Sequence, residues 1–159
     1  MVACPLRHRA DLRSVPFLQG ALVMDEPVMS GAFRFNAIPQ MPVPPFEGRA
    51  IDTYIGDWNA DNTLRWRSRP VPKNILGLAV PLWAGRGDKA LLVDIVVVST
   101  GEILLHLNPA PTASWEFVVV RVPVRIWGER LEIIAKDSGK GLGSWLAVGQ
   151  PQILLAQSP

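Results

Sequence analysis

The chain has 159 residues, of which 48% are hydrophobic and 19% are charged, so its composition is that of one packed domain and excludes global disorder. Its net charge of +2 is too small to indicate a nucleic-acid partner. The single cysteine, Cys4, excludes an internal disulfide, and no apolar run reaches the ~20 residues of a membrane span.

The first 45 residues hold seven of the fifteen prolines and show no sustained hydrophobic period. Proline fixes φ and removes a backbone donor, so this region is predicted to be an irregular or extended arm. Residues 1–20 are interpreted as a tail whose order the sequence leaves open, without the apolar core of a signal peptide. Residues 21–159 are interpreted as one β-sandwich domain, with a first strand over 32–36.

From Phe46 onward the hydrophobic period is two, which is typical of strands with one face on a core. The strand predicted over 64–69 turns Leu64, Trp66 and Ser68 inward and three arginines outward. A run over 118–127 alternates in the same way and leaves Trp127 exposed. Residues 131–136 form another alternating strand.

The run over residues 91–98 is apolar on both faces and predicts a central strand. Short turn-rich segments separate all these strands, and no convincing amphipathic helix occurs between them. The pattern predicts an all-β antiparallel sandwich of the jelly-roll type.

The order of these landmarks resembles that of the galactose-binding-like jelly rolls, which occur as carbohydrate-binding or accessory modules of bacterial extracytoplasmic proteins. The resemblance covers residues 46–156, and the landmarks that carry it are segment 56–68, Trp115, the valine-rich strand, Gly128, strand 131–135, Asp137 and segment 144–148. It implies a sugar site in loops at one end of the sandwich, an extracytoplasmic location and, commonly, a structural calcium ion. No calcium loop and no sugar-binding signature is complete, so the metal ligands are left open.

Catalytic machinery is poorly supported by the sequence. Only His8 and His106 are available as histidine ligands or bases, and no zinc-protease, nucleophile-elbow or phosphate-loop motif occurs. The acids Asp57, Asp61 and Asp137 are the only candidates for a glycosidase pair. The chain is therefore expected not to be an enzyme and to need no cofactor, with a small hydrolase as the least supported reading.

Trp58 is the strongest candidate for ligand contact, because it lies in a polar, turn-like segment. Its indole would stack on a sugar face while neighbouring acids and amides bond the hydroxyls, and these candidate neighbours are Asp57, Asn59, Asp61, Asn62 and Asp137. The alternative is that Trp58 only covers one end of the sandwich. Trp66 and Trp145 are interpreted as core residues.

Arg65, Arg67 and Arg69 form a stripe on the outer face of their predicted strand. If that strand lay beside the one carrying Arg121 and Arg125, the combined patch would suit a carboxylate or phosphate on a ligand. The alternative is a solvated face that protects the sheet from edge pairing. Arg65 and Arg67 are kept as candidate ligand contacts.

Two functional hypotheses remain in front. The first is a non-catalytic binding module that recognises a carbohydrate or similar polar ligand through loops at one end of the sandwich. The second is an assembly module that forms a homo-oligomer through apolar sheet edges, with the proline-rich arm crossing onto a neighbour.

Overall fold

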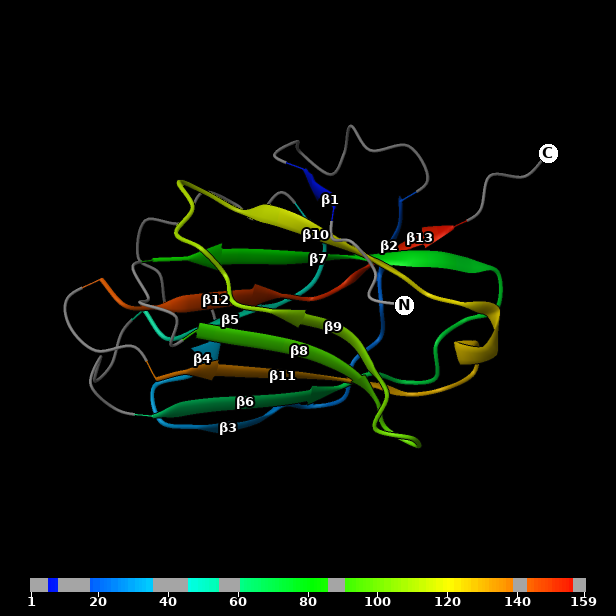
Figure 1. Ribbon diagram of the computed structural model, residues 1–159, viewed down its shortest axis with the longest axis horizontal. Coiled ribbons are helices and arrows are strands. Elements are labelled where there is room, and N and C mark those ends of the chain that lie inside the picture. Colours follow the sequence, from blue (N-terminus) through cyan, green and yellow to red (C-terminus); the bar gives the residue numbers. More distant parts are fainter. Residues whose placement is uncertain are drawn as a thin grey trace.

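The computed structural model describes residues 6–8, 18–35, 46–54, 61–85, 91–138 and 143–155. In these ranges the chain forms β-strands and one 3-10 turn, arranged as two antiparallel sheets packed face to face (Figure 1). No helix within them is long and apolar enough to cross a membrane. The predicted all-β antiparallel sandwich is confirmed.

The larger sheet is built around the ten-residue strand β7 (Ile75–Ala84). On one side β7 pairs with β10 (Glu116–Arg121), which in turn pairs with β1 (Leu6–His8). On its other side it pairs first with β13 (Gln152–Leu155) and then with β12 (Leu146–Gly149). The remaining strands are β2 (Leu18–Ala21) beside β13, and β5 (Ala50–Asp52) and β4 (Arg34–Phe35) beyond β12.

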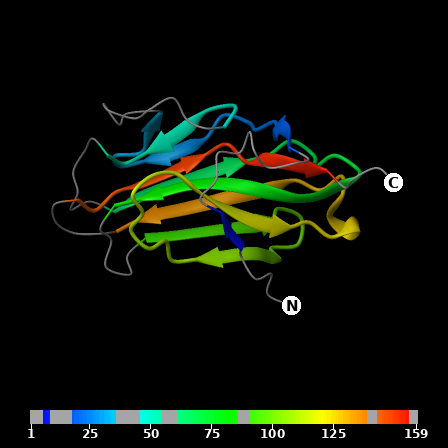
Figure 2. The same ribbon diagram turned by 90° about the horizontal axis from the view of Figure 1, so that it is seen from above.

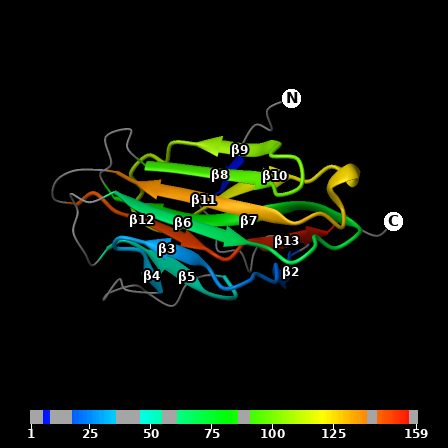
Figure 3. The same ribbon diagram turned by 90° about the horizontal axis from the view of Figure 1, so that it is seen from below.

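The smaller sheet has the strand order β3-β6-β11-β8-β9 (Figure 3). Its strands are β3 (Val28–Ser30), β6 (Asn62–Arg67), β11 (Leu131–Asp137), β8 (Leu91–Val97) and β9 (Ile103–Leu107). The strand predicted over 91–98 is paired on both sides, as expected of a central strand. Figure 2 shows the two sheets from another direction.

The core lies between the sheets and includes the residues of β6, β10 and β11 that the sequence predicts to face inward. Leu64 and Trp66 of β6 are 0% and 1% exposed, and the outward Arg65 and Arg67 lie in solvent. Further buried members of the same cluster are Leu78, Val80, Leu82, Val93, Ile95, Val118, Val120, Ile133, Ala135, Leu146 and Val148. Burial of these apolar side chains is the main favourable contribution to folding.

The strand predicted over residues 118–127 is wrong beyond Arg121. Pro123 follows, and because proline cannot donate to the sheet, the chain leaves it and forms the 3-10 turn η2 (Val124–Ile126). Val124 is consequently 67% exposed instead of buried. Trp127 is half-buried instead of exposed, and its Nε1 donates a hydrogen bond of 3.0 Å to the carbonyl of Ile75.

The N-terminal region differs from the prediction in detail. The first strand predicted over 32–36 is only β4 in the structure, preceded by the buried Ala32 and Phe33, and Asn36 lies outside the described residues. Strands β1 and β2 begin within the segment interpreted as a tail and pair with β10 and β13.

Candidate functional site

Several strands begin or finish at the same end of the sandwich, on the left in Figure 1. In the smaller sheet, Asn62 at the start of β6 pairs with Asp137 at the end of β11, which pairs with Leu91 at the start of β8. In the larger sheet, Leu146 at the start of β12 pairs with Ala84 at the end of β7. Segments 55–60, 86–90 and 139–142, which lie outside the described residues, all join strands at this end.

A buried polar network links the two sheets here. The hydroxyl of Thr53, which follows β5, donates to Asp137 Oδ2 at 2.6 Å and accepts from the backbone N–H of Leu146 at 2.9 Å. The hydroxyl of Ser144 donates to the other carboxylate oxygen at 3.4 Å. Thr53, Asp137 and Ser144 are at most 2% exposed, so this network holds the strand ends in a fixed relation.

Asn62 belongs to the same network. Its amide nitrogen donates to the Asp137 carbonyl at 3.3 Å, and its amide oxygen accepts from the Ala32 N–H at 2.6 Å. The side chain is 2% exposed and connects β6, β11 and the segment before β4. The structure therefore brings Asn62 and Asp137 together and buries both of them.

The other predicted site residues are distributed over different surfaces. Asp61 is exposed beside the network, at the point where segment 55–60 enters β6. Asp57, Trp58 and Asn59 lie outside the described residues. Arg65 and Arg67 are further along β6 with their side chains on the outer face, so they do not join Asn62, whose side chain points inward.

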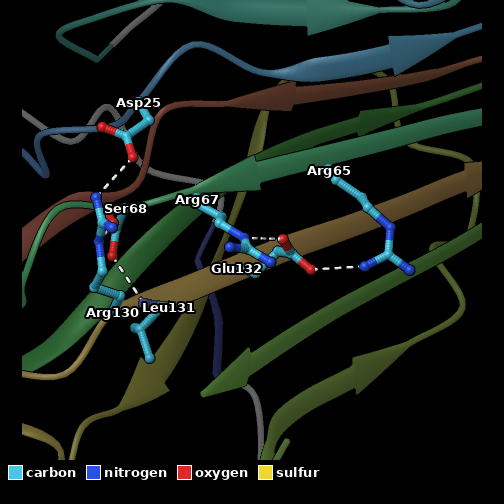
Figure 4. A network of polar contacts seen from close by, with 7 residues as sticks. All are labelled: Asp25, Arg65, Arg67, Ser68, Arg130, Leu131 and Glu132. Atoms are coloured by element: carbon cyan, nitrogen blue, oxygen red, sulfur yellow. Dashed lines mark hydrogen bonds and ion pairs between the residues drawn. The ribbon is translucent and has the colours of Figure 1, made fainter. Parts of the chain in front are cut away.

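Instead, the two arginines converge on Glu132 of the neighbouring strand β11 (Figure 4). Arg65 Nη1 lies 2.9 Å from one Glu132 carboxylate oxygen, and Arg67 Nε lies 2.6 Å from the other. The Glu132 side chain is only 7% exposed, whereas those of the arginines are 54% and 53% exposed. Both oxygens of a nearly buried carboxylate are thus neutralised by two half-exposed cations.

A second carboxylate is shared in the same way. Asp25 binds Arg69 through one oxygen and Arg130 through the other, each at 2.8 Å. Arg121, in contrast, is on β10 of the larger sheet. Because β6 and β10 belong to different sheets, the combined arginine patch considered from the sequence does not form.

Aromatic rings form a continuous row at this end and along the outer face of the larger sheet. Consecutive rings meet edge to face with centroid separations of 4.9–6.4 Å. In order, the row is Tyr54, Trp145, Trp83, Trp115, Phe46 and Phe117, and it is called the aromatic row below. Trp115 and Phe117 are buried, while the other four rings are half-buried. Edge-to-face contact adds stability beyond the area buried.

The row lies outside the sandwich core because Trp83 points to the outer face of β7. Trp115 and Trp145 directly precede β10 and β12 and continue the outward alternation of those strands. Trp83 shares the parity of Gly77, Ala79 and Pro81, which are small or compact residues. Close approach requires glycine at two further places: a Cβ at Gly149 would lie 2.6 Å from Phe46 Cζ, and one at Gly85 would overlap the Trp145 indole. Trp66 is a core residue as predicted, but Trp145 packs on the outer face. The sequence signal for this outer-face packing is that Trp83 shares a strand face with small residues.

Trp115 carries a further feature of the aromatic row. The residue is 4% exposed, and its indole N–H is the one buried side-chain donor or acceptor in the described part of the chain that lacks a hydrogen-bond partner. An unsatisfied buried donor costs about 1–3 kcal/mol. The row therefore includes a polar donor enclosed by aromatic surface.

Among the described residues, no three His, Cys, Asp or Glu side chains are placed to hold a metal ion. The calcium ion implied by the resemblance stays a prediction that involves loop residues. His106 Nδ1 lies 2.6 Å from Asp94 Oδ1 on the outer face of the smaller sheet, and Asp94 is three residues along β8 from Leu91, which pairs with Asp137.

No family model and no curated protein matches the chain. Solved structures do resemble it. The C-terminal extracellular domain of Mycobacterium tuberculosis EmbC superposes with a TM-score of 0.51 at 15% identity, over 91% of this chain and 60% of that one. TmCBM61 in complex with β-1,4-galactotriose has a TM-score of 0.48 at 13% identity, over 84% and 91% of the two chains.

The enzymatically active domain of bacteriophage CBA120 tailspike protein 4 is also similar, with a TM-score of 0.47 at 13% identity, over 87% of this chain and 19% of that one. The likeness to the EmbC domain is one of fold. Together with the two packed antiparallel sheets, it confirms the antiparallel β-sandwich fold predicted from the sequence.

Proposed function

We propose that this chain is a non-catalytic binding module that recognises a carbohydrate at the end of the sandwich where β6, β8 and β12 begin. The observation that carries the proposal is the exposed part of the aromatic row. Tyr54, Trp145 and Trp83 present half-buried rings in consecutive contact, and Tyr54 directly precedes segment 55–60 in the sequence. Aromatic rings with a few convergent polar groups are typical of sites that bind sugars and other small polar ligands.

The buried network supports this proposal by making the site rigid. Thr53 and Asp137 join the two sheets at described strand ends that precede segments 55–60 and 139–142, and this contact restrains the relative position of those ends. A preorganised site loses less conformational entropy when a ligand binds. In the proposal, Asn62 and Asp137 are positioning residues, and direct contacts come from the rings and from Asp57, Trp58, Asn59 and Asp61.

A thermal-shift screen against soluble polysaccharides and oligosaccharides, with and without calcium, tests the proposal. A glycan present at 100 times its dissociation constant adds about 2.7 kcal/mol to the free energy of unfolding, which is a readily measured shift. We expect Trp58→Ala and Trp145→Ala to weaken association at least tenfold, about 1.4 kcal/mol. Trp145→Phe, which retains a ring, serves as the matched control and is expected to keep most of the affinity.

Two results would overturn the proposal. One is a panel in which no glycan shifts the melting temperature. The other is a glycan that binds equally well to the native chain, to Trp58→Ala and to Trp145→Ala, because the contact then lies elsewhere on the molecule.

A second candidate function is homo-oligomer formation, favoured by the two edge strands of the smaller sheet. Val28 on β3 is 71% exposed and Ile103 on β9 is 58% exposed. Exposed apolar residues on edge strands promote pairing between chains. Light scattering with size-exclusion chromatography tests this: an oligomer that becomes monomeric in Val28→Lys or Ile103→Lys would support it, and a monomeric native chain would exclude it.

A further inference from the structure

A pocket of about 370 Å³ lies at the opposite end of the sandwich from the candidate sugar site. It is formed where β7 begins, where β10 ends and where η2 turns back, near the coiled ribbon on the right of Figure 1. β7 runs from Ile75 at this pocket to Ala84 at the other end, so about 30 Å separates the two regions. The pocket is called the η2 pocket below.

The walls of the η2 pocket are mostly apolar and unusually exposed. Leu76 and Val124 line it and are 52% and 67% exposed, which makes them two of the five exposed large hydrophobic residues in the described part of the chain. Trp127 forms another wall, and its hydrogen bond to Ile75 fixes the orientation of the indole. Apolar surface concentrated in a concave site favours an apolar ligand.

One cationic side chain, that of Arg121, lines this apolar site. Arg121 is exposed at the end of β10 and lines the pocket, and no described residue is its ion-pair or hydrogen-bond partner. Arg65, Arg67, Arg69 and Arg130, by contrast, each bind a carboxylate. The Arg121 guanidinium is therefore available to pair with an anionic group on a ligand.

The pocket also has a polar rim with a specific backbone conformation. Asn74 lines it with a φ of 68°, in the left-handed region that asparagine tolerates better than most residues. This turn directs the chain into β7 and places the Asn74 amide beside the pocket. The η2 pocket thus combines apolar walls, one amide and one guanidinium that pairs with no described residue.

We propose that the η2 pocket binds a small amphipathic anion, with its apolar body against Leu76, Val124 and Trp127 and its carboxylate or phosphate monoester on Arg121. A pocket of this volume falls in the ~300–1,000 Å³ range of small-molecule sites and suits an aliphatic body of about eight carbons. This site is separate from the proposed sugar site and does not depend on it.

NMR titration of the full chain with octanoate and with octyl phosphate tests the proposal, with octanamide as the neutral analogue and acetate as the anion that lacks the body. We expect saturable shifts of the Trp127 indole N–H, and at least tenfold tighter binding of one of the two anions than of octanamide or acetate. The tighter of octanoate and octyl phosphate identifies the head group.

Arg121→Gln is expected to weaken binding of the preferred anion about tenfold and to leave octanamide binding unchanged, because only a charge-assisted contact is lost. Arg125→Gln is the matched control: it removes a nearby arginine that is already paired with Glu102, and it should change neither affinity. Val124→Glu adds a repelling charge at an exposed position and should abolish binding of the anion.

The proposal is overturned if the Trp127 indole signal does not move, if octanamide binds as tightly as both anions, or if Arg121→Gln binds the anion as well as the native chain does. If Arg121→Gln does not fold, the proposal is overturned when Val124→Glu binds the anion as tightly as the native chain does.

Discussion

Thr53 from the larger sheet and Asp137 from the smaller sheet are joined by a hydrogen bond of 2.6 Å between two fully buried side chains. Sheets in a sandwich otherwise contact each other through apolar side chains. Here a polar contact sets their relative position at the end where the loops begin. The hydroxyl also accepts the Leu146 N–H, so one side chain connects β5, β11 and β12.

Replacing Thr53 with Val should therefore destabilise the chain strongly. The change conserves shape but leaves the Asp137 carboxylate and the Leu146 N–H without this partner, and we expect a loss of about 2–4 kcal/mol in the free energy of unfolding. Thr53→Ser keeps the hydroxyl and should lose about 1 kcal/mol, the value of one buried methyl group. Urea denaturation measures both, and equal stability of the two variants would show that the hydrogen bond contributes little.

Gly85→Ala should disturb the aromatic row. The added Cβ would overlap Trp145 Nε1 and the carbonyl oxygen of Gly143, and because the second is backbone, the chain at Gly143, just before β12, must shift. We expect a destabilisation of about 1–3 kcal/mol, as for other overpacked sites, and a change in tryptophan fluorescence. Gly101→Ala is the control, because nothing lies within 4 Å of the new Cβ. This variant should be destabilised only by the strain of its positive φ and should keep the native tryptophan fluorescence.

The contributions of Arg65 and Arg67 to the free energy of unfolding should be non-additive, because both bind Glu132. Losing either Arg65 or Arg67 should cost at most about 1 kcal/mol, because each is half-exposed and the other remains. The double variant Arg65→Gln/Arg67→Gln should cost about 3 kcal/mol, since it leaves a nearly buried carboxylate unpaired. Adding Glu132→Gln to the double variant should recover part of that loss. A double variant whose cost equals the sum of the single costs would contradict this description of the network.

The exposed pair of Glu102 and Arg125 should be visible in a pH titration. Hydrogen bonding from Arg125 holds the pKa of the Glu102 carboxyl below its usual range. A carboxyl with a lowered folded-state pKa stabilises the fold above the usual pKa of glutamate, and that contribution disappears as the pH falls through the lowered value. NMR titration of Glu102 should give a low pKa in the native chain and a higher one in Arg125→Gln. A titration unaffected by that substitution would mean that the pair does not persist in solution.

Local alternation predicted the inward and outward faces of β6 and β11 correctly. It did not predict the end of β10, where Pro123 removes a donor and starts η2, although proline itself was visible in the sequence. Trp145 was assigned to the core from its apolar neighbours. It directly precedes β12, and the alternation of that strand turns its side chain outward, into the aromatic row.

The sequence by itself determined the fold class and the inward faces of β6 and β11, because side-chain alternation in a strand depends only on residues two positions apart. Only the tertiary structure decided that Arg65 and Arg67 meet Glu132 and not Arg121, that Asn62 and Asp137 are buried together, and that six rings from separate segments form one row. These relationships depend on which strands become neighbours and in which register, and those pairings join residues far apart in the chain, which no local pattern specifies.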